Sequence, residues 1–178
     1  MKIVRIFEGQ NNLLSFKYDD EGDNEFERLF DLWNDTEYLN KFFEDNQEYF
    51  KDSYWSTKSI NELAMDTREL AGKFEGKLLE YKYVSEQKKY LEEIFEPLSL
   101  ASFGERSLTK SKAKELWLRI YALKVNKSDY IITGGAIKLT RKMDDHEITK
   151  HEKEKLDKCR DYLIENGITD IEQIECIL

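Results

Sequence analysis

The chain has 178 residues, a formal net charge of −9 at pH 7, 40% hydrophobic residues and 13% aromatic residues. This length allows a single domain with a proper buried core, and the aromatic content argues against intrinsic disorder. No run approaches the roughly 20 apolar residues that span a bilayer, and the first residues lack the pattern of a signal peptide, so we expect a cytoplasmic protein without a membrane segment.

Residues 1–22 predict a β-hairpin. Apolar and polar side chains alternate in Lys2–Phe7 and again in Leu13–Tyr18, and residues 9–12 between these runs have turn chemistry. An isolated hairpin is only marginally stable, so we expect these two strands to join a sheet with strands further along the chain.

Residues 23–96 predict a helical part. The first helix has apolar residues at the i, i+3, i+4 and i+7 positions of an amphipathic helix: Phe26, Leu29, Phe30 and Trp33. Residues 34–36 interrupt it, and a second, aromatic-rich helix continues to Phe50. A capping box at Ser59 and Glu62 opens a third helix, whose apolar face extends to Tyr81. Pro97 predicts the end of the last helix, because the residue before a proline is pushed away from helical geometry.

Residues 115–142 predict a second β-hairpin, after a polar stretch, Ser99–Lys114, that we interpret as an exposed basic loop. Residues 126–129 have turn chemistry, and pairing Asn126 with Asp129 sorts the side chains onto two faces, because they alternate along each strand. The predicted core face carries Leu116, Leu118, Ile120 and Ala122 opposite Leu139, Ile137, Gly135 and Thr133. The predicted outward face carries Trp117, Arg119, Tyr121 and Leu123 opposite Lys138, Ala136, Gly134 and Ile132.

Gly134 and Gly135 lie in the middle of the second strand of this hairpin, where glycine is unfavourable. They indicate either a bulge, or space for Tyr121 to lie across the sheet, or a surface kept clear for the backbone of a ligand. No phosphate-loop or dinucleotide fingerprint surrounds them, so we expect no cofactor.

Residues 149–167 predict the C-terminal helix, opened by a capping box at Thr149 and Glu152 and ended by Gly167. Its buried stripe is Leu156, Cys159 and Leu163. Residues 1–178 together predict a single α+β domain, in which the N-terminal strands and the C-terminal hairpin form a twisted antiparallel sheet packed against several amphipathic helices.

The charge is distributed unevenly along the chain. Residues 106–160 carry 15 basic and 8 acidic side chains, whereas residues 1–105 have a net charge of −11 and residues 161–178 one of −5. The overall acidity argues against a general nucleic-acid binder but allows a confined basic site; a charge match between the two parts of the fold is the alternative.

The basic side chains gather on and beside the outward face of the hairpin. Arg119 and Lys138 share that face, and Arg141 and Lys142 lie where it ends. The simpler interpretations are that Arg119 pairs with an acidic residue of the N-terminal helices and that the other three form a solvated rim. Two cysteines without a CxxC pair, and two histidines five positions apart, predict neither a disulfide framework nor a metal site.

Phe95–Leu98, the strand around Leu118 and Arg119, and the run Ile137–Lys142 before a final helix together resemble the RelE/HigB-like toxin superfamily. This resemblance covers about the C-terminal third. It implies a small α+β protein with a strand, helices, a twisted antiparallel sheet and a final helix. The helical part is longer here, and the chain is acidic where such ribonucleases tend to be basic. The whole chain also resembles a family of uncharacterised bacterial proteins that share the run TGGAIKLT, and this second likeness implies no activity.

The resemblance implies a bacterial toxin that inhibits translation or cleaves RNA without a metal, through the neighbouring 2′-hydroxyl, and is held in check by a helix-turn-helix antitoxin; RNA or the ribosome is then the target. The catalytic candidates are Arg119, Lys138, His146 and His151, with the histidines as proton carriers. The RNA-binding candidates are Trp117, Tyr121, Arg141 and Lys142, the two aromatic residues as stacking partners of bases. Each aromatic residue is alternatively covered by helices, and each histidine is alternatively a surface residue at a helix start.

Two other functions remain open. The chain lacks a recognised catalytic triad, metal cluster or phosphate loop, which favours a non-enzymatic protein-interaction module. A phage- or defence-related accessory protein with a RelE-like fold is the third possibility, because fold and function separate readily.

Overall fold

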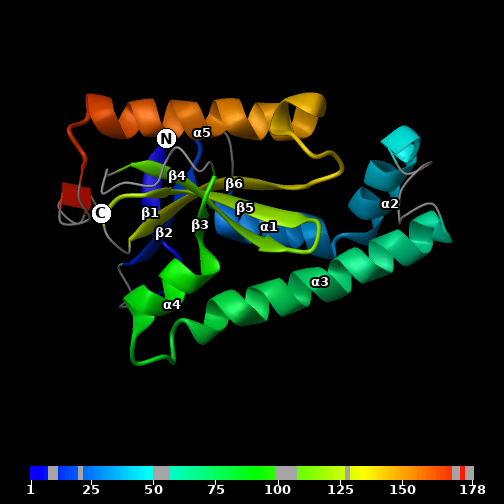
Figure 1. Ribbon diagram of the computed structural model, residues 1–178, viewed down its shortest axis with the longest axis horizontal. Coiled ribbons are helices and arrows are strands. Elements are labelled where there is room, and N and C mark those ends of the chain that lie inside the picture. Colours follow the sequence, from blue (N-terminus) through cyan, green and yellow to red (C-terminus); the bar gives the residue numbers. More distant parts are fainter. Residues whose placement is uncertain are drawn as a thin grey trace.

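The computed structural model describes residues 1–7, 12–19, 22–49, 57–98, 108–126, 129–169 and 173–174, and everything below refers to them. The described residues form five α-helices and a six-stranded sheet (Figure 1). The helices are α1 (Glu25–Asn34), α2 (Thr36–Asp45), α3 (Ile60–Glu80), α4 (Gln87–Ile94) and α5 (Glu147–Glu165), with 3-10 turns at Gln47–Tyr49 and Met143–Asp145. The strands are β1 (Lys2–Arg5), β2 (Leu13–Lys17), β3 (Glu96–Pro97), β4 (Thr109–Glu115), β5 (Leu118–Lys124) and β6 (Tyr130–Ile137).

The strands lie in the order β1-β2-β6-β5-β4-β3. All neighbouring pairs are antiparallel except β2 and β6, which run parallel with Leu14 opposite Ile131. This pairing joins the N-terminal hairpin to the C-terminal strands, as the instability of an isolated hairpin requires. The α+β class and both hairpins predicted from the sequence are confirmed; the predicted turn at residues 9–11 lies outside the described residues.

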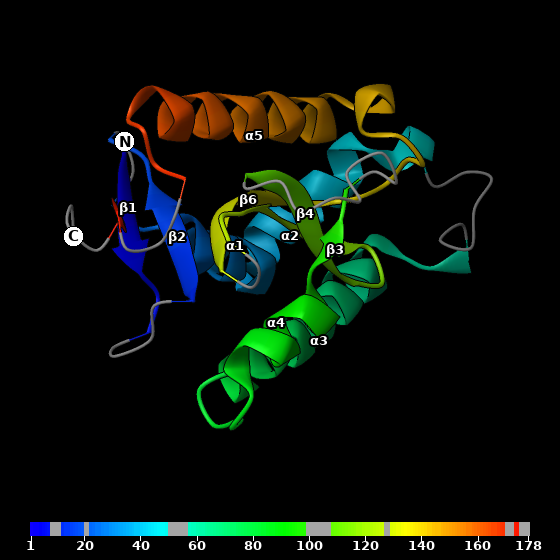
Figure 2. The ribbon, with the colours of Figure 1, turned by 60° about the vertical axis from the view of Figure 1, so that its left-hand side comes forward.

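Each face of the sheet has its own hydrophobic core. On one face, α1 and α3 cover a core that includes Leu118 and Ile120 of β5. On the other face, α5 covers a second core that includes Leu123 of β5, with the predicted stripe of Leu156, Cys159 and Leu163 fully buried. Figures 1 and 2 show α5 and α3 on opposite sides of the sheet. No described helix is both long and apolar enough to cross a membrane.

The helix boundaries follow local capping chemistry. The side chain of Asp35 accepts hydrogen bonds from Glu37 and Tyr38 at the start of α2, which is the predicted break after the first helix. The capping box of Ser59 and Glu62 is present at the start of α3. The second helix is shorter than predicted, because α2 ends at Asp45 and a 3-10 turn replaces its continuation. Gly167 ends α5 with a φ of +67°, as predicted.

The capping box predicted at Thr149 and Glu152 is wrong. Helix α5 begins at Glu147, and His146 is its N-cap, with ring Nδ1 accepting a hydrogen bond from the Ile148 N–H at 3.2 Å. Thr149 instead donates to the carbonyl of Met143 at 2.7 Å. The helix therefore starts earlier than the Ser/Thr-x-x-Glu pattern indicates, and Glu152 is free to point into the fold.

The exposed loop predicted for Ser99–Lys114 is wrong for the part that the structure describes. Thr109–Glu115 form strand β4, in which the side chains of Ser111 and Ala113 are buried. The polar side chains of this segment predict a loop, but small residues at alternate positions allow it to pair along the whole of β5.

The face assignment of the second hairpin is correct along β5 from Leu118 to Leu123 and wrong in β6 before Gly134. The predicted pairing holds from Leu118 to Tyr121, but a bulge shifts the register so that Ala122 lies opposite Ile132. Ile132 therefore packs in the core under α1 and α3, opposite to the prediction. At the other end, the chain turns between β4 and β5, so that Leu116 is exposed and Trp117 is buried against the helices.

The two central glycines make space for side chains from both covering layers. A Cβ on Gly134 would clash with the carboxylate of Glu152 from α5. A Cβ on Gly135 would clash with the carbonyl oxygen of Arg119 and lie 2.8 Å from the side chain of Leu29 on α1. The predicted bulge is present, and the space on either side of β6 holds protein side chains.

We expect Gly135→Ala to destabilise the fold by about 2 kcal/mol or more, because its Cβ meets rigid backbone, whereas Gly134→Ala meets the movable end of a side chain and costs less. Urea denaturation measures the difference. Gly72→Ala is the control: no atom lies within 4 Å of its Cβ, and in a helix interior it should stabilise by roughly 0.5–1 kcal/mol. Equal losses in the two β6 variants would contradict this account of the strand.

Candidate functional site

Basic side chains surround a cleft of about 250 Å³ on the α5 side of the sheet, beyond the start of α5. Five of the eight residues that line it are lysine or arginine. The lining residues are Leu98, Lys112, Arg119, Tyr121, Lys138, Arg141, Lys142 and Met143, and we call this cavity the basic cleft.

The strand register places these residues together. Lys112 of β4 lies opposite Tyr121 of β5, and Arg119 is two positions before Tyr121 on the same face. Arg119 lies opposite Ala136 of β6, and Lys138 follows Ala136 by two positions. Strands β4 and β5 and the residue that follows β6 therefore direct cations to one place on one face.

The Arg119 guanidinium donates to the main-chain carbonyls of Leu116 at 2.6 Å and Leu118 at 2.8 Å. Within the described residues its hydrogen bonds go to these carbonyls and to no carboxylate of the N-terminal helices. Burial lowers the pKa of Arg119, partly opposed by the charge of Glu96.

Lys138 carries the clearest electrostatic signal. Burial lowers its pKa, and the positive charges of Arg119 and Lys112 lower it further. Glu96 lies 3.6 Å from the ammonium of Lys112, but its shorter ion pair, at 2.9 Å, is with Lys114 outside the cleft. Like charges held together in a partly buried cavity favour binding of an anion, which would relieve their repulsion.

Other predicted site residues lie elsewhere or are covered. Trp117 packs on the α3 side, where its indole N–H donates to Thr67 at 3.1 Å. Tyr121 lines the cleft but is 1% exposed, and burial raises its pKa to about 12. Its ring lies in the core under α5, so it offers no open face on which a base could stack. Both outcomes correspond to the alternative in which the aromatic residues are covered.

Neither histidine lines the basic cleft. The His146 ring is buried: Nδ1 caps α5, Nε2 lies 2.8 Å from the amide oxygen of Asn46, and the ring packs on Tyr49. Burial lowers the pKa of His146. His151 is exposed on α5. The proton-carrying role predicted for these two residues therefore has no support from their positions.

Lys112 is absent from the predicted site residues, because the sequence predicts a loop for the segment that holds it. The alternation of lysines at positions 110, 112 and 114 with Ser111 and Ala113 was the available signal, since it is typical of a strand with one basic face.

A buried cluster of charged side chains beside β6 joins Glu25 and Arg28 of α1 to Glu152 and Lys155 of α5. The Glu25 carboxylate is fully buried and receives two hydrogen bonds of 2.8 Å from Arg28 and one of 2.7 Å from Lys155. Burial raises the pKa of Glu152 to about 7, with the charge of Lys155 opposing this and that of Glu25 adding to it. Glu152 lies against Gly134, so the cluster fills the space that the glycine provides. Its buried position between three elements indicates a structural role.

We expect Glu152 to make the protein less stable as the pH rises. Its folded pKa lies above its ordinary value of 4.5, so the folded state binds the proton more tightly, and stability falls between pH 4.5 and about 7 by up to about 3 kcal/mol. Glu152→Gln removes this titration and should flatten the loss, measured by urea denaturation at pH 5 and pH 8. Glu154→Gln, at an exposed position of the same helix, is the control and should leave the pH dependence unchanged.

No protein-family model, curated protein or solved structure matches this chain. Within the described residues, no three histidine, cysteine, aspartate or glutamate side chains are grouped so that they could hold a metal ion. The basic cleft is the main candidate site, because it gathers five cationic side chains around one cavity.

Proposed function

We propose that this protein binds RNA through the basic cleft and inhibits translation in the manner of a RelE/HigB-like toxin, controlled by a partner antitoxin. The observation that carries the proposal is the convergence of Lys112, Arg119, Lys138, Arg141 and Lys142 on one cavity of a protein whose net charge is negative. A confined cationic site in an acidic chain is suited to a polyanion that is engaged at one place.

The order of elements also supports the proposal. N-terminal strands, a helical part, the antiparallel strands β4–β6 and a final helix follow one another, as the resemblance to RelE/HigB-like toxins implies. Such an arrangement is compatible with many functions, so the cleft carries more weight than the fold.

The cleft offers the groups needed for cleavage by the neighbouring 2′-hydroxyl. In that reaction the hydroxyl attacks the phosphorus and loses its proton to water, the bond from phosphorus to the 5′ oxygen breaks, and that oxygen takes a proton. Arg119 stabilises the negative charge of the phosphorane. Lys138, whose pKa burial lowers, donates the proton to the leaving oxygen and regains one from water.

The second candidate is non-enzymatic: the same cleft binds RNA or an acidic partner and blocks translation without cleaving anything. The positions of both histidines outside the cleft favour it, because the remaining proton donor is a lysine. Binding and cleavage therefore need separate measurements.

Binding of a fluorescent single-stranded RNA 12-mer should weaken and become less salt-dependent in Arg119→Ala/Lys138→Ala. Each lost phosphate contact should reduce the slope of log K against log salt by about 0.7. Fluorescence anisotropy at several salt concentrations gives this slope. Lys41→Ala/Lys158→Ala, at exposed positions on α2 and α5, is the charge-matched control. Equal slopes for the two double variants would show that the cleft is not the RNA site.

Induced expression of the wild-type chain should arrest growth, and Lys138→Arg separates binding from chemistry. Arginine keeps the positive charge but cannot release a proton near neutral pH, so RNA binding should persist while cleavage falls at least 100-fold. Gel analysis of a labelled RNA with and without a 2′-deoxy nucleotide measures the cleavage. Growth arrest by Lys138→Arg without any RNA cleavage supports the non-enzymatic candidate, and normal growth with wild type overturns the proposed function.

A further inference from the structure

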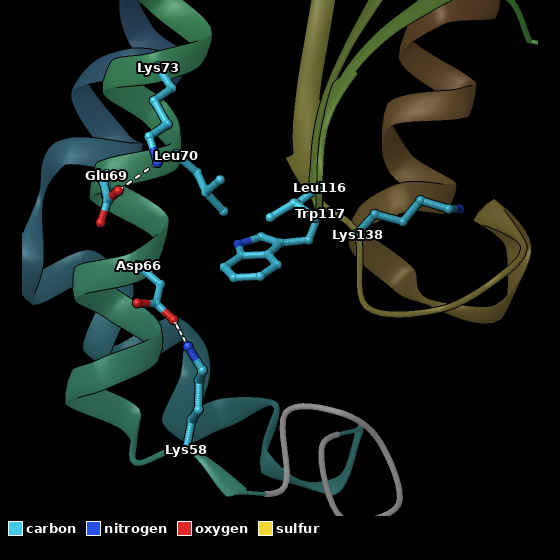
Figure 3. A pocket seen from close by; sticks show the side chains of 8 residues that line it. All are labelled: Lys58, Asp66, Glu69, Leu70, Lys73, Leu116, Trp117 and Lys138. Atoms are coloured by element: carbon cyan, nitrogen blue, oxygen red, sulfur yellow. Dashed lines mark hydrogen bonds and ion pairs between the residues drawn. The ribbon is translucent and has the colours of Figure 1, made fainter.

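A second, larger cavity of about 440 Å³ lies between α3 and the turn that joins β4 to β5 (Figure 3). Its size is within the range of small-molecule and nucleoside sites. The residues that line it are Lys58, Asp66, Glu69, Leu70, Lys73, Leu116, Trp117 and Lys138, and we call it the α3 pocket.

The inner surface of the α3 pocket is apolar and has one flat ring. In Figure 3 the indole of Trp117 extends toward α3, beneath Leu116 and facing Leu70. The hydrogen bond from the indole N–H to Thr67 fixes the ring's orientation. The indole is only 7% exposed, so little of it faces the pocket, and the exposed side chain of Leu116 supplies the open apolar surface.

Leu116 is unusual for its position in the turn. Its φ is +46°, in the left-handed region that glycine and asparagine favour, and its side chain is 66% exposed. A leucine gains nothing from packing there and bears the strain of the backbone. Its side chain nevertheless forms part of the pocket wall, so a ligand in the pocket would bury it.

The rim on α3 holds charges that neutralise one another. Lys58 pairs with Asp66, and Lys73 pairs with Glu69 at 2.6 Å (Figure 3). These pairs offer hydrogen-bond donors and acceptors side by side without demanding a charged ligand. A flat heteroaromatic group with donors and acceptors on its edge fits such a rim.

Lys138 connects the α3 pocket to the basic cleft, because it lines both cavities. Its main-chain N–H donates to the carbonyl of Trp117 at 2.8 Å, which holds the two residues next to each other at the end of the hairpin. In Figure 3 the side chain of Lys138 points away from the indole. Its aliphatic stem thus borders the apolar pocket, while its ammonium serves the cationic cavity.

We propose that the α3 pocket takes one unpaired nucleobase of the RNA whose phosphate lies at Lys138. The inference rests on the proposed function and narrows its substrate class to single-stranded RNA or a looped-out nucleotide. A base inside a duplex cannot enter, because it is stacked on both sides. The base packs against the exposed side chain of Leu116, beside the largely buried indole, and its edge meets the two ion pairs at the rim.

The test compares a labelled single-stranded uridine 10-mer with a 10-mer of the same backbone whose internal positions carry no bases. Wild type should bind the intact RNA about ten-fold more tightly, the contribution expected when one base packs on an apolar side chain such as Leu116. The variant is Leu116→Gly, which removes the side chain and suits the positive φ, so that the fold is preserved. Met65→Ala, at an exposed apolar position of α3 that does not line the pocket, is the matched control.

Leu116→Gly should lose most of the preference for the intact RNA and leave binding of the baseless RNA unchanged, whereas Lys138→Ala should weaken both. If Leu116→Gly retains the full preference, or weakens both RNAs equally, the base pocket is overturned while RNA binding at the basic cleft stands. Loss of growth arrest in Leu116→Gly with unchanged RNA affinity also overturns it, in favour of a protein partner. If wild type binds neither RNA, the proposed function itself fails.

Discussion

The fold depends on how closely helices approach both faces of β6. All eight residues of this strand are buried, because α1 packs on one face and α5 on the other. Gly134 and Gly135 make this possible: side chains at these positions would collide with Glu152 on the α5 side and with Leu29 on the α1 side. A strand covered on both faces has little room for polar groups, yet the space beside Gly134 holds a carboxylate. The positive charges of Lys155 and Arg28 stabilise the buried carboxylates there. Arg28 pairs with Glu25, and Lys155 pairs with both Glu25 and Glu152.

The position of the basic cleft follows from this packing. Helix α5 covers the α5 face of the sheet over the length of the second core, and Arg119 and Lys138 lie at the end of the hairpin that it leaves uncovered. There the strand alternation still directs side chains to one face, and they line the basic cleft beside Leu98 and Met143. Burial lowers the pKa of Lys138, and repulsion from Arg119 and Lys112 lowers it further. An arrangement that lowers the stability of the unliganded protein in this way is typical of a binding site.

The sequence was sufficient where the signal was local and periodic. Spacing and turn chemistry predict the helical stripes, the caps of α2 and α3, the α+β class and the inward residues Leu118 and Ile120.

The sequence was insufficient where packing between segments far apart in the chain decides the position of a residue. The bulge in β6 reverses Ile132 because α1 and α5 dictate the packing there, and local pairing rules do not contain that constraint. The prediction of His146 as a proton carrier has the same limit, because nothing nearby in the sequence reveals that Asn46 and Tyr49 pack against its ring. Four of the eight predicted site residues line the basic cleft and stay outside the core: Arg119, Lys138, Arg141 and Lys142. They stay outside because charged side chains seldom enter a core.

Lys138 occupies the point where two different environments meet. The last residue of β6, Ile137, is still paired with Leu118 and buried, whereas the next residue leaves the sheet while its N–H remains bonded to Trp117. On one side lies an apolar pocket with an indole, and on the other a cavity lined by cations. A lysine suits this boundary because its long stem is hydrophobic and its tip is charged. An aliphatic residue would extend the pocket but remove the cation, and a short polar residue would reach neither cavity. A ligand with an apolar ring and an adjacent anion would use both properties of this side chain at once, and a nucleotide is such a ligand.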